Sequence, residues 1–250
     1  MNQRRTRAAS TRPRRAAQRS HPLGEVEAIE PAEIALVVIA KEPVAGRCKT
    51  RLCPPLDHAQ AAALAAAALA DTLEAVAATP ASRRVVALEG TPGDWLPPGF
   101  EVVDQGEGAL DARLATAFET VAEPALVVGM DTPQLLPADL IQAMAALAGH
   151  GVDAVVGGAE DGGYWAIGLR EADRRVFSGV PMSSAQTGHA QRARFRTLGL
   201  HWLELAAMRD VDTIEDVAAV AALSPQSRFA CRFAELQAPA DPKELIGAGR

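Results

Sequence analysis

Four cations follow an apolar run near the start of the chain, in the segment KEPVAGRCKTRL, residues 41–52. They are Lys41, Arg47, Lys49 and Arg51. Gly46 stands among them and allows a close backbone approach or a positive φ. Clustered donors and positive charge directly after a strand suit the binding of a diphosphate or triphosphate. The alternative is a solvated basic loop with a glycine turn.

This loop matches neither of the two best-known phosphate-binding sequences. A P-loop requires glycine directly before its lysine, whereas Cys48 precedes Lys49 here. The G-x-G-x-x-G pattern of dinucleotide-binding folds is also absent. The loop therefore needs another explanation.

A second candidate is Asp131, which follows the apolar segment ALVVGM, residues 125–130. A carboxylate at the end of a buried strand can hold Mg²⁺ against a phosphate, because Mg²⁺ takes one or two carboxylates together with phosphate oxygens. The alternative is a helix N-cap, a role that suits Asp and Thr and that Pro137 at the following helix start would support.

A third candidate is Asp212 in the segment DVDTIED, residues 210–216. Thr213 and Asp216 have the spacing of a capping box at the start of a helix. That pattern does not require Asp212, which is left as a possible second carboxylate of a metal site.

The fourth candidate is the segment AEDGGYWAIGL, in which acidic residues and glycines precede two aromatic residues. It contains Glu160, Asp161, Gly162, Gly163 and Tyr164. The Asp-Gly pair is a strong hairpin signal. The glycines also let a substrate approach, so a turn and a binding site are compatible here.

Short apolar segments alternate with helical patterns along the chain. Expected strands cover 33–41, 83–88, 100–105, 125–130, 152–158, 164–169 and 201–206. Expected helices cover 58–78, 107–122, 137–149, 185–198 and 213–223. This alternation predicts an α/β fold of three layers, α/β/α, with a mostly parallel, Rossmann-like sheet. In such sheets ligands bind beyond the carboxyl ends of the strands, where these candidate segments begin.

Composition narrows the class of protein. Hydrophobic residues make up 48% of the 250 residues, and the net charge is −6, which does not favour nucleic-acid binding by the folded part. Three cysteines without a C-x-x-C pair indicate a reducing, cytoplasmic setting and argue against structural zinc. No apolar segment suggests a membrane anchor.

Three parts are expected along the chain. Residues 1–30 form a disordered basic tail, since the first twenty carry seven arginines and no acid. Residues 31–223 form the nucleotide-binding domain, and residues 224–250 are a weakly structured C-terminal extension.

Taken in order, the four segments resemble a bacterial family of glycosyltransferase-A-like proteins of uncharacterised function. That family is similar in turn to the nucleotidyltransferases that include 2-phospholactate guanylyltransferase and molybdenum-cofactor guanylyltransferase. The resemblance covers about residues 33–220. It departs from the related sequences at Ile214, where proline is usual, and near Met182, where a tryptophan is expected.

The resemblance implies a nucleotide-binding fold of the glycosyltransferase-A type and a role for each segment. Nucleotide phosphates would be bound by Lys41, Gly46, Lys49 and Arg51. Asp131 and Asp212 would hold Mg²⁺ or Mn²⁺. The acceptor would lie against Glu160, Asp161, Gly162, Gly163 and Tyr164.

Three functions remain open on this basis. In nucleotidyl transfer, a phosphorylated small molecule attacks an NTP and pyrophosphate leaves, with Lys49, Arg51 and Asp131 as the catalytic groups. In glycosyl transfer, the donor is a nucleotide-diphospho-sugar, and the D-x-D pattern at 210–212 would fit its metal. The third possibility is a nucleotide-binding protein without turnover. The expected partners are a nucleotide and a small-molecule acceptor, with no nucleic acid and no membrane.

Overall fold

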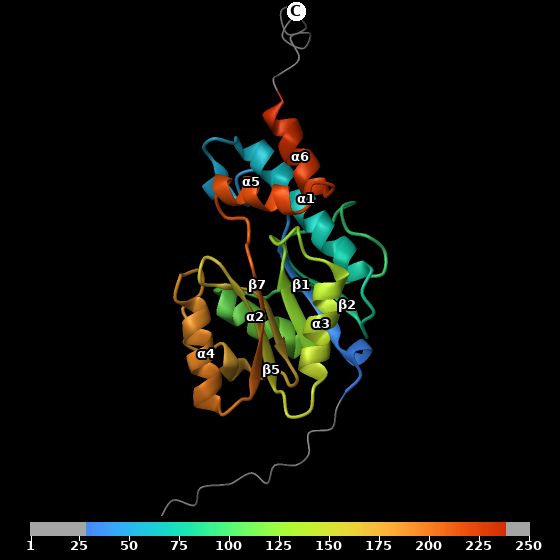
Figure 1. Ribbon diagram of the computed structural model, residues 1–250, viewed down its shortest axis with the longest axis vertical. Coiled ribbons are helices and arrows are strands. Elements are labelled where there is room, and N and C mark those ends of the chain that lie inside the picture. The colour runs from blue at the N-terminus through green and yellow to red at the C-terminus, as the bar shows by residue number, and fades with distance from the viewer. Residues whose placement is uncertain (1–28, 239–250) are drawn as a thin grey trace, which may run out of the picture.

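The computed structural model describes residues 29–238 and contains a seven-stranded sheet with helices on both faces (Figure 1). The strands are β1 (Ala35–Lys41), β2 (Arg84–Glu89), β3 (Glu101–Asp104), β4 (Ala125–Gly129), β5 (Ala154–Ala159), β6 (Tyr164–Leu169) and β7 (Trp202–Met208). The helices are α1 (His58–Ala77), α2 (Leu110–Val121), α3 (Pro137–Ala148), α4 (Thr187–Leu198), α5 (Ile214–Leu223) and α6 (Arg228–Gln237). Short 3₁₀ turns lie at Pro31–Glu33, Thr50–Leu52 and Arg174–Val176.

The strand order is β3-β2-β1-β4-β6-β5-β7, and every neighbouring pair is parallel except those that involve β6. The predicted three-layer fold with a mostly parallel sheet is therefore confirmed. Strands β1, β2 and β3 extend in one direction across the sheet, and β4 returns to the other side of β1. The carboxyl ends of β1 and β4 thus flank the point where the strand order reverses, which is where ligands bind in such sheets.

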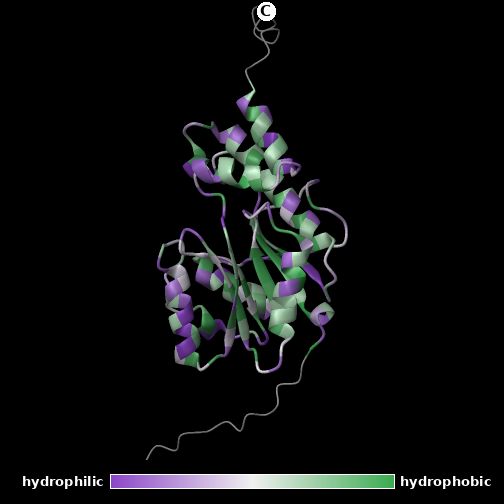
Figure 2. Ribbon diagram, viewed as in Figure 1, coloured by the Kyte–Doolittle hydropathy of each residue, from purple (hydrophilic) through white to green (hydrophobic). Residues whose placement is uncertain are grey.

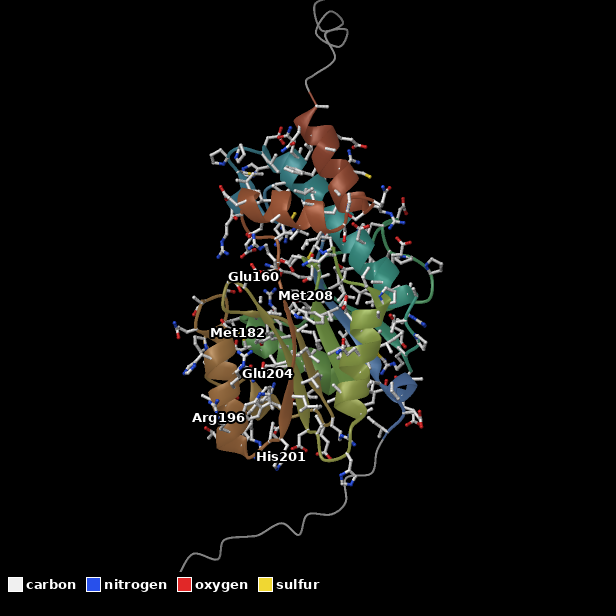
Figure 3. The ribbon with its side chains drawn as sticks, in the orientation of Figure 1. Glu160, Met182, Arg196, His201, Glu204 and Met208 are labelled. Carbon is white, nitrogen blue, oxygen red and sulfur yellow. The ribbon has the colours of Figure 1, made fainter. Side chains whose placement is uncertain are left out.

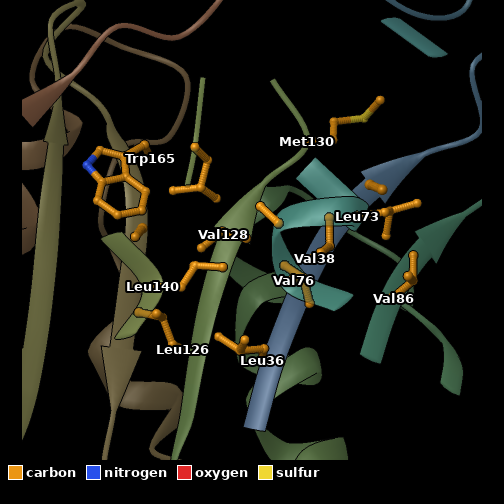
Figure 4. Close-up of a cluster of buried hydrophobic side chains, with 14 of the residues drawn as sticks. Leu36, Val38, Leu73, Val76, Val86, Leu126, Val128, Met130, Leu140 and Trp165 are labelled. Atoms are coloured by element: carbon orange, nitrogen blue, oxygen red, sulfur yellow. The ribbon is translucent and has the colours of Figure 1, made fainter. Parts of the chain in front are cut away.

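Each face of the sheet has its own hydrophobic core. One core joins β1, β2 and β4 to α1 and α3 through residues such as Leu36, Val38, Leu73 and Leu140 (Figure 4). The other joins the opposite face to α2 and α4 and includes Phe118. The central strands are consequently apolar, whereas α4 is mostly hydrophilic (Figure 2).

A small helical lobe lies beyond the carboxyl ends of β1 and β7 (Figure 1). We use "helical lobe" for the amino-terminal half of α1 together with α5 and α6. These helices share a third hydrophobic cluster, whose members are Leu52, Ala61, Leu64, Ala68, Val211, Val217, Val220, Phe229 and Phe233. Two of those residues, Leu52 and Val211, come from the loops after β1 and β7, so both loops are packed into the lobe.

Helix α6 corrects the expectation that residues 224–250 are weakly structured. Ser227 caps its amino terminus by accepting a hydrogen bond from the Ala230 amide, at 3.0 Å. Phe229 and Phe233 are one helical turn apart and both are buried. The spacing of the two phenylalanines behind a serine is the signal that could have predicted this helix. Residues 1–28 and 239–250, including most of the expected basic tail, lie outside the described residues.

Helix α1 is long and apolar enough to cross a membrane by length and composition alone. The core helices of globular domains pass the same test, and 56% of the relevant window is buried inside the protein. One stripe of its apolar residues packs against the sheet, and a second stripe, Ala61, Leu64 and Ala68, packs in the cluster shared with α5 and α6. The structure therefore accounts for the hydrophobicity of α1 by internal packing.

Candidate functional site

All four segments singled out from the sequence meet at one edge of the sheet. The loops after β1, β4 and β7 start from the carboxyl ends of parallel strands. Strand β6 is antiparallel to β5, so the turn between them, residues 160–163, also lies at that edge. A cavity of about 850 Å³ opens there and is lined by residues from all four segments. Figure 3 labels Glu160 and Met208 near this edge and His201 at the opposite end of the sheet.

Lys49 is at the centre of the polar contacts in this cavity. Its Nζ donates to Asp131 Oδ2 at 2.5 Å, to Asp212 Oδ1 at 3.2 Å and to the Val211 carbonyl. Its side chain is only 12% exposed. Burial by itself lowers the pKa of Lys49, but the charges of Asp131 and Asp212 more than offset it, so the pKa is raised and the ammonium form is retained.

The other cations of the loop are placed differently. Arg51 is largely exposed and its Nη1 donates to Asp212 Oδ2 at 2.7 Å. Lys41 pairs with Glu89 at 3.0 Å, and Glu89 also binds Arg113. The Glu89 carboxylate therefore offsets part of the positive charge at that side of the cavity.

Gly46 and Arg47 form the outer part of the same loop. Gly46 has a φ of +76°, a conformation that side-chain-bearing residues rarely adopt. A Cβ built at this position would meet nothing within 4 Å, so the glycine serves the turn and leaves open space. Arg47 lines the cavity beside it.

Asp131 is not the N-cap of the following helix. Helix α3 begins at Pro137, and its N-cap is Leu136. The carboxylate of Asp131 instead binds Lys49, while its backbone carbonyl accepts from the Val211 amide at 3.1 Å. The loops after β4 and β7 are thereby joined directly. Thr213 and Asp216, in contrast, form the predicted capping box of α5.

A cluster of three carboxylates extends from Asp212 to Asp161 and Asp210. One oxygen from each lies within 4.8 Å of the others, a spacing that could hold a metal ion. Burial, together with the negative charges of Asp161, Asp212 and Asp131, raises the pKa of Asp210 to about 6. The cluster brings Asp161 and Asp210 next to the Asp212 carboxylate. The resemblance implies an acceptor-binding role for Asp161. Asp210 was visible in the sequence only as the first member of D-x-D.

The turn after β5 divides into lining and structural residues. Asp161, Gly163 and Tyr164 line the cavity. Gly162 has a φ of +93°, and a Cβ there would lie 2.3 Å from the Ala185 carbonyl oxygen, so this glycine permits close packing of the loop before α4. Glu160 pairs with Arg209 at 2.5 Å outside the lining of the cavity.

Tyr164 lies inside the cavity against Met182. Its hydroxyl donates to the sulfur of Met182 at 3.6 Å. Burial raises the pKa of Tyr164, and the nearby charge of Asp111 adds to the effect, so the phenol remains protonated. The methionine thus fills the position next to Tyr164.

Gln105 is a lining residue that the sequence analysis did not identify. Its side chain is almost fully buried after β3, and Nε2 donates to the carbonyls of Ala40 at 2.6 Å and Ala87 at 2.8 Å. Carbonyl oxygens can only accept hydrogen bonds, so the NH₂ group of Gln105, and not its amide oxygen, must face them. This fixes the orientation of the amide. The Gln105 oxygen is therefore the group that this side chain can offer to a ligand.

Sequence families and solved structures show what this chain is similar to. The sequence model of the family described as "Uncharacterized protein conserved in bacteria (DUF2064)" matches residues 60–184, half of the 250-residue chain, and the chain belongs to this family. None of the functionally curated proteins compared with the chain matches it.

Three solved structures illustrate the structural likeness. A "putative nucleotide-diphospho-sugar transferase" from Desulfovibrio desulfuricans G20 is 25% identical, with a TM-score of 0.73 over 80% of this chain and 94% of that one. A cytidylyltransferase from Leptospira borgpetersenii serovar Hardjo-bovis is 15% identical, with a TM-score of 0.52 over 82% and 94%. CMP:2-keto-3-deoxy-manno-octonic acid synthetase complexed with CTP is 14% identical, with a TM-score of 0.50 over 78% and 99%.

The last two show the fold alone. Together the three confirm the expected resemblance of this chain to the nucleotidyltransferase and glycosyltransferase-A folds.

Proposed function

We propose that this member of the DUF2064 family is a divalent-cation-dependent nucleotidyltransferase, which transfers NMP from an NTP to a phosphorylated small-molecule acceptor. The observation that carries the proposal is the meeting of Lys49 with two strand-end carboxylates, Asp131 and Asp212, where the strand order reverses. A cavity lined by both cations and carboxylates suits a polyphosphate and its cation.

The residues fit the cation that the fold implies. Asp131 and Asp212 would hold Mg²⁺ or Mn²⁺, with Asp161 and Asp210 within reach of the Asp212 side. The ligands are carboxylate oxygens only, which these hard cations prefer. When bound, the cation supplies charge neutralisation of phosphate oxygens. The raised pKa of Asp210 fits the same donor set, because burial and the neighbouring carboxylates disfavour the charged form that a cation would favour.

The reaction asks for alignment rather than for a protein nucleophile. An oxygen of the acceptor phosphate attacks the α-phosphorus of the NTP, and the bond from that phosphorus to the α–β bridging oxygen breaks. Pyrophosphate carries the electron pair away. Arg47, Lys49 and Arg51 would neutralise the charge of the pyrophosphate as it forms.

The nucleoside and acceptor would occupy different walls of the cavity. Gln105 would accept a hydrogen bond from an N–H group of the base, since its amide nitrogen is already used. Asp161, Gly163 and Tyr164 would lie on the acceptor side. We also propose a cytoplasmic setting, where NTPs are available and the three free cysteines stay reduced.

Glycosyl transfer from a nucleotide-diphospho-sugar is the second candidate. It is favoured by the convergence of Asp210 and Asp212, a D-x-D pair, with Asp161. The likeness to the Desulfovibrio protein, which carries a nucleotide-sugar description, points the same way. These three carboxylates would then hold the cation of the diphosphate leaving group.

A thermal-shift screen tests the proposal against both alternatives. The full-length protein is heated with NTPs, NDP-sugars and NDPs, each with and without Mg²⁺, because binding to the native state raises the midpoint. The proposed function expects one NTP to stabilise the protein in the presence of Mg²⁺. It expects that shift to be lost in Lys49→Ala and Asp131→Ala and kept in Arg175→Ala, which removes an exposed cation paired with Asp173.

Each other outcome has a definite meaning. Selective stabilisation by an NDP-sugar would replace nucleotidyl transfer with glycosyl transfer. A binding protein without turnover would be indicated by two results together: nucleotide still binds after the loss of Asp212, and the protein releases no pyrophosphate with any acceptor. No shift with any nucleotide would overturn the proposal.

A further inference from the structure

Lys49 has no donor left for a phosphate. A lysine ammonium carries three N–H groups, and those of Lys49 are used by Asp131, Asp212 and the Val211 carbonyl. The nucleotide-binding role proposed for Lys49 therefore requires the side chain to leave its present partners.

The ammonium also lies where a divalent cation would have to bind. Nζ is 2.5 Å from Asp131 Oδ2 and 3.2 Å from Asp212 Oδ1, so it lies between the two carboxylates. Mg²⁺ binds carboxylate oxygens at about 2.0–2.1 Å, so a cation shared by these two oxygens would occupy nearly the same position. Two cations cannot share it, because of both contact and charge repulsion.

We propose that Lys49 is an internal counter-ion that exchanges with the divalent cation: the cation can bind Asp131 and Asp212 only when Lys49 moves to the nucleotide phosphates. This inference rests on the proposed function, since it takes these two aspartates as the cation ligands.

The exchange conserves favourable contacts only when both ligands arrive. A cation alone would leave the Lys49 ammonium without its three acceptors in a poorly exposed place. A nucleotide alone would draw Lys49 away, leaving Asp131 without its cation and Asp212 with Arg51 alone. With both present, phosphate oxygens replace the carboxylates around Lys49, and the cation replaces Lys49 between the carboxylates. The cation and the nucleotide therefore bind interdependently.

The neighbourhood allows such a movement. The cavity of about 850 Å³ adjoins Lys49, and Arg47 and Arg51 line it beside the same loop. Both arginines would attract the negatively charged phosphates to which Lys49 moves. The lysine side chain has four rotatable bonds, so the exchange needs no change in the strands.

The test measures Mn²⁺ binding by electron paramagnetic resonance in the full-length protein, with no nucleotide present. We expect Lys49→Met to bind Mn²⁺ about tenfold more tightly than the wild type or better, within the usual range of coupling between two sites. Arg47→Met is the matched control, since it removes one cation from the same cavity. Arg47 is not a partner of Asp131 or Asp212 in the described part of the chain. We expect its Mn²⁺ affinity to stay within about threefold of the wild type.

Two further variants keep the test decisive. Lys49→Gln replaces Lys49→Met if the latter does not fold, and its Mn²⁺ affinity should rise in the same direction. Adding Asp131→Asn to Lys49→Met should remove the gained affinity. The exchange is overturned if Lys49→Met and wild type bind Mn²⁺ equally, if Arg47→Met gains as much, or if the binding ignores Asp131→Asn. The last result would place the cation at Asp161, Asp210 and Asp212 instead.

Failure of the exchange is distinct from failure of the proposed function. If Lys49→Met gains Mn²⁺ affinity while the wild type shows no thermal shift with any nucleotide, Lys49 still excludes the cation as an internal counter-ion. Nucleotidyl transfer then fails, together with the movement of Lys49 to nucleotide phosphates. If an NTP and Mg²⁺ stabilise the wild type but Lys49→Met gains no Mn²⁺ affinity, only the exchange is overturned.

Discussion

The candidate site lies between two regions that hold their functional residues in different ways. On the sheet side, Asp131 follows β4, whose residues are buried in the two cores of the α/β domain. On the lobe side, Lys49 and Asp212 are neighbours of Leu52 and Val211, which pack into the smaller cluster of the helical lobe. The carboxylate of one side meets the ammonium of the other.

This difference makes the sheet side of the site more rigid than the lobe side. A strand end inside a seven-stranded sheet has backbone hydrogen bonds on both sides and little freedom. The loops that carry Lys49 and Asp212 depend on packing among three helices. Loss of lobe packing should therefore affect ligand binding before it affects the sheet.

The largest effect is expected from the carboxylate on the lobe side. Asp212→Asn should lower transferase activity by about 100-fold or more, because it removes a ligand charge and a partner of both Lys49 and Arg51. The measurement is pyrophosphate release with the NTP found in the screen. Glu215→Gln, an equal charge change on an exposed residue nearby, should remain near wild type. Equal losses in the two variants would mean that the effect is not specific to the site.

The next prediction compares the two regions directly through buried phenylalanines. Phe229→Ala in the lobe and Phe118→Ala beside the sheet should each lower the free energy of unfolding by about 3–5 kcal/mol. Phe118 stacks on Phe177, so its loss should lower the stability of the whole domain. Phe229→Ala should instead expose α5 and α6 locally and weaken nucleotide binding in the folded protein.

Hydrogen exchange read by mass spectrometry distinguishes these outcomes. Under native conditions, Phe229→Ala should speed exchange in α5, α6 and the loop 42–57 while β1 and β4 remain protected. Uniformly faster exchange in both variants would show that the lobe and the sheet unfold as one unit, and the comparison would then fail.

A smaller effect is expected at the contact between α1 and α6. Asp71 accepts hydrogen bonds from the amides of Arg228 at 3.0 Å and Phe229 at 2.8 Å, so it caps α6 from another helix. Asp71→Ala should lower the free energy of unfolding by about 1–2 kcal/mol, measured by urea denaturation. Glu74→Ala removes only an exposed ion-pair partner of Arg228 and should cost about 0.5 kcal/mol or less. The reverse order would contradict the capping role.

The smallest effect concerns Cys48, which adjoins Lys49. Burial raises the pKa of the Cys48 thiol, although the charges of Lys49 and Lys41 oppose that effect. Cys48 should therefore react with iodoacetamide more slowly than the exposed Cys231 at pH 8, as followed by peptide mass spectrometry. Lys49→Met should slow Cys48 further; faster reaction would show that the loop has opened.

The raised pKa of Cys48 also fixes the direction in which the free energy of unfolding changes with pH. Folding favours the protonated Cys48 thiol, so its contribution is present below the ordinary thiol pKa and is lost as the pH rises towards the raised value. Stability near pH 7 should therefore depend little on Cys48.

Much of the fold follows from local patterns. The apolar segments of β1, β2 and β4, the long apolar α1 and the capping box of Thr213 and Asp216 all occur as the sequence predicts. Helix α6 was not predicted, since its stability comes from two phenylalanines packing on α1 rather than from a long periodic pattern. Gln105 was not predicted because an isolated glutamine after a strand carries no signal until its neighbours are known.

The sequence by itself determined which segments are candidates for the chemistry, because cations, carboxylates and glycines at strand ends depend only on residue type and periodicity. It also determined the α/β class, since strands and helices alternate along the chain. Only the tertiary structure decided which charges meet. Lys49 and Asp131 are 82 residues apart, and Lys49 and Asp212 are 163 apart, so only the strand order and lobe packing bring them together. The same packing gathers Asp161, Asp210 and Asp212, where crowding and burial set the pKa of Asp210.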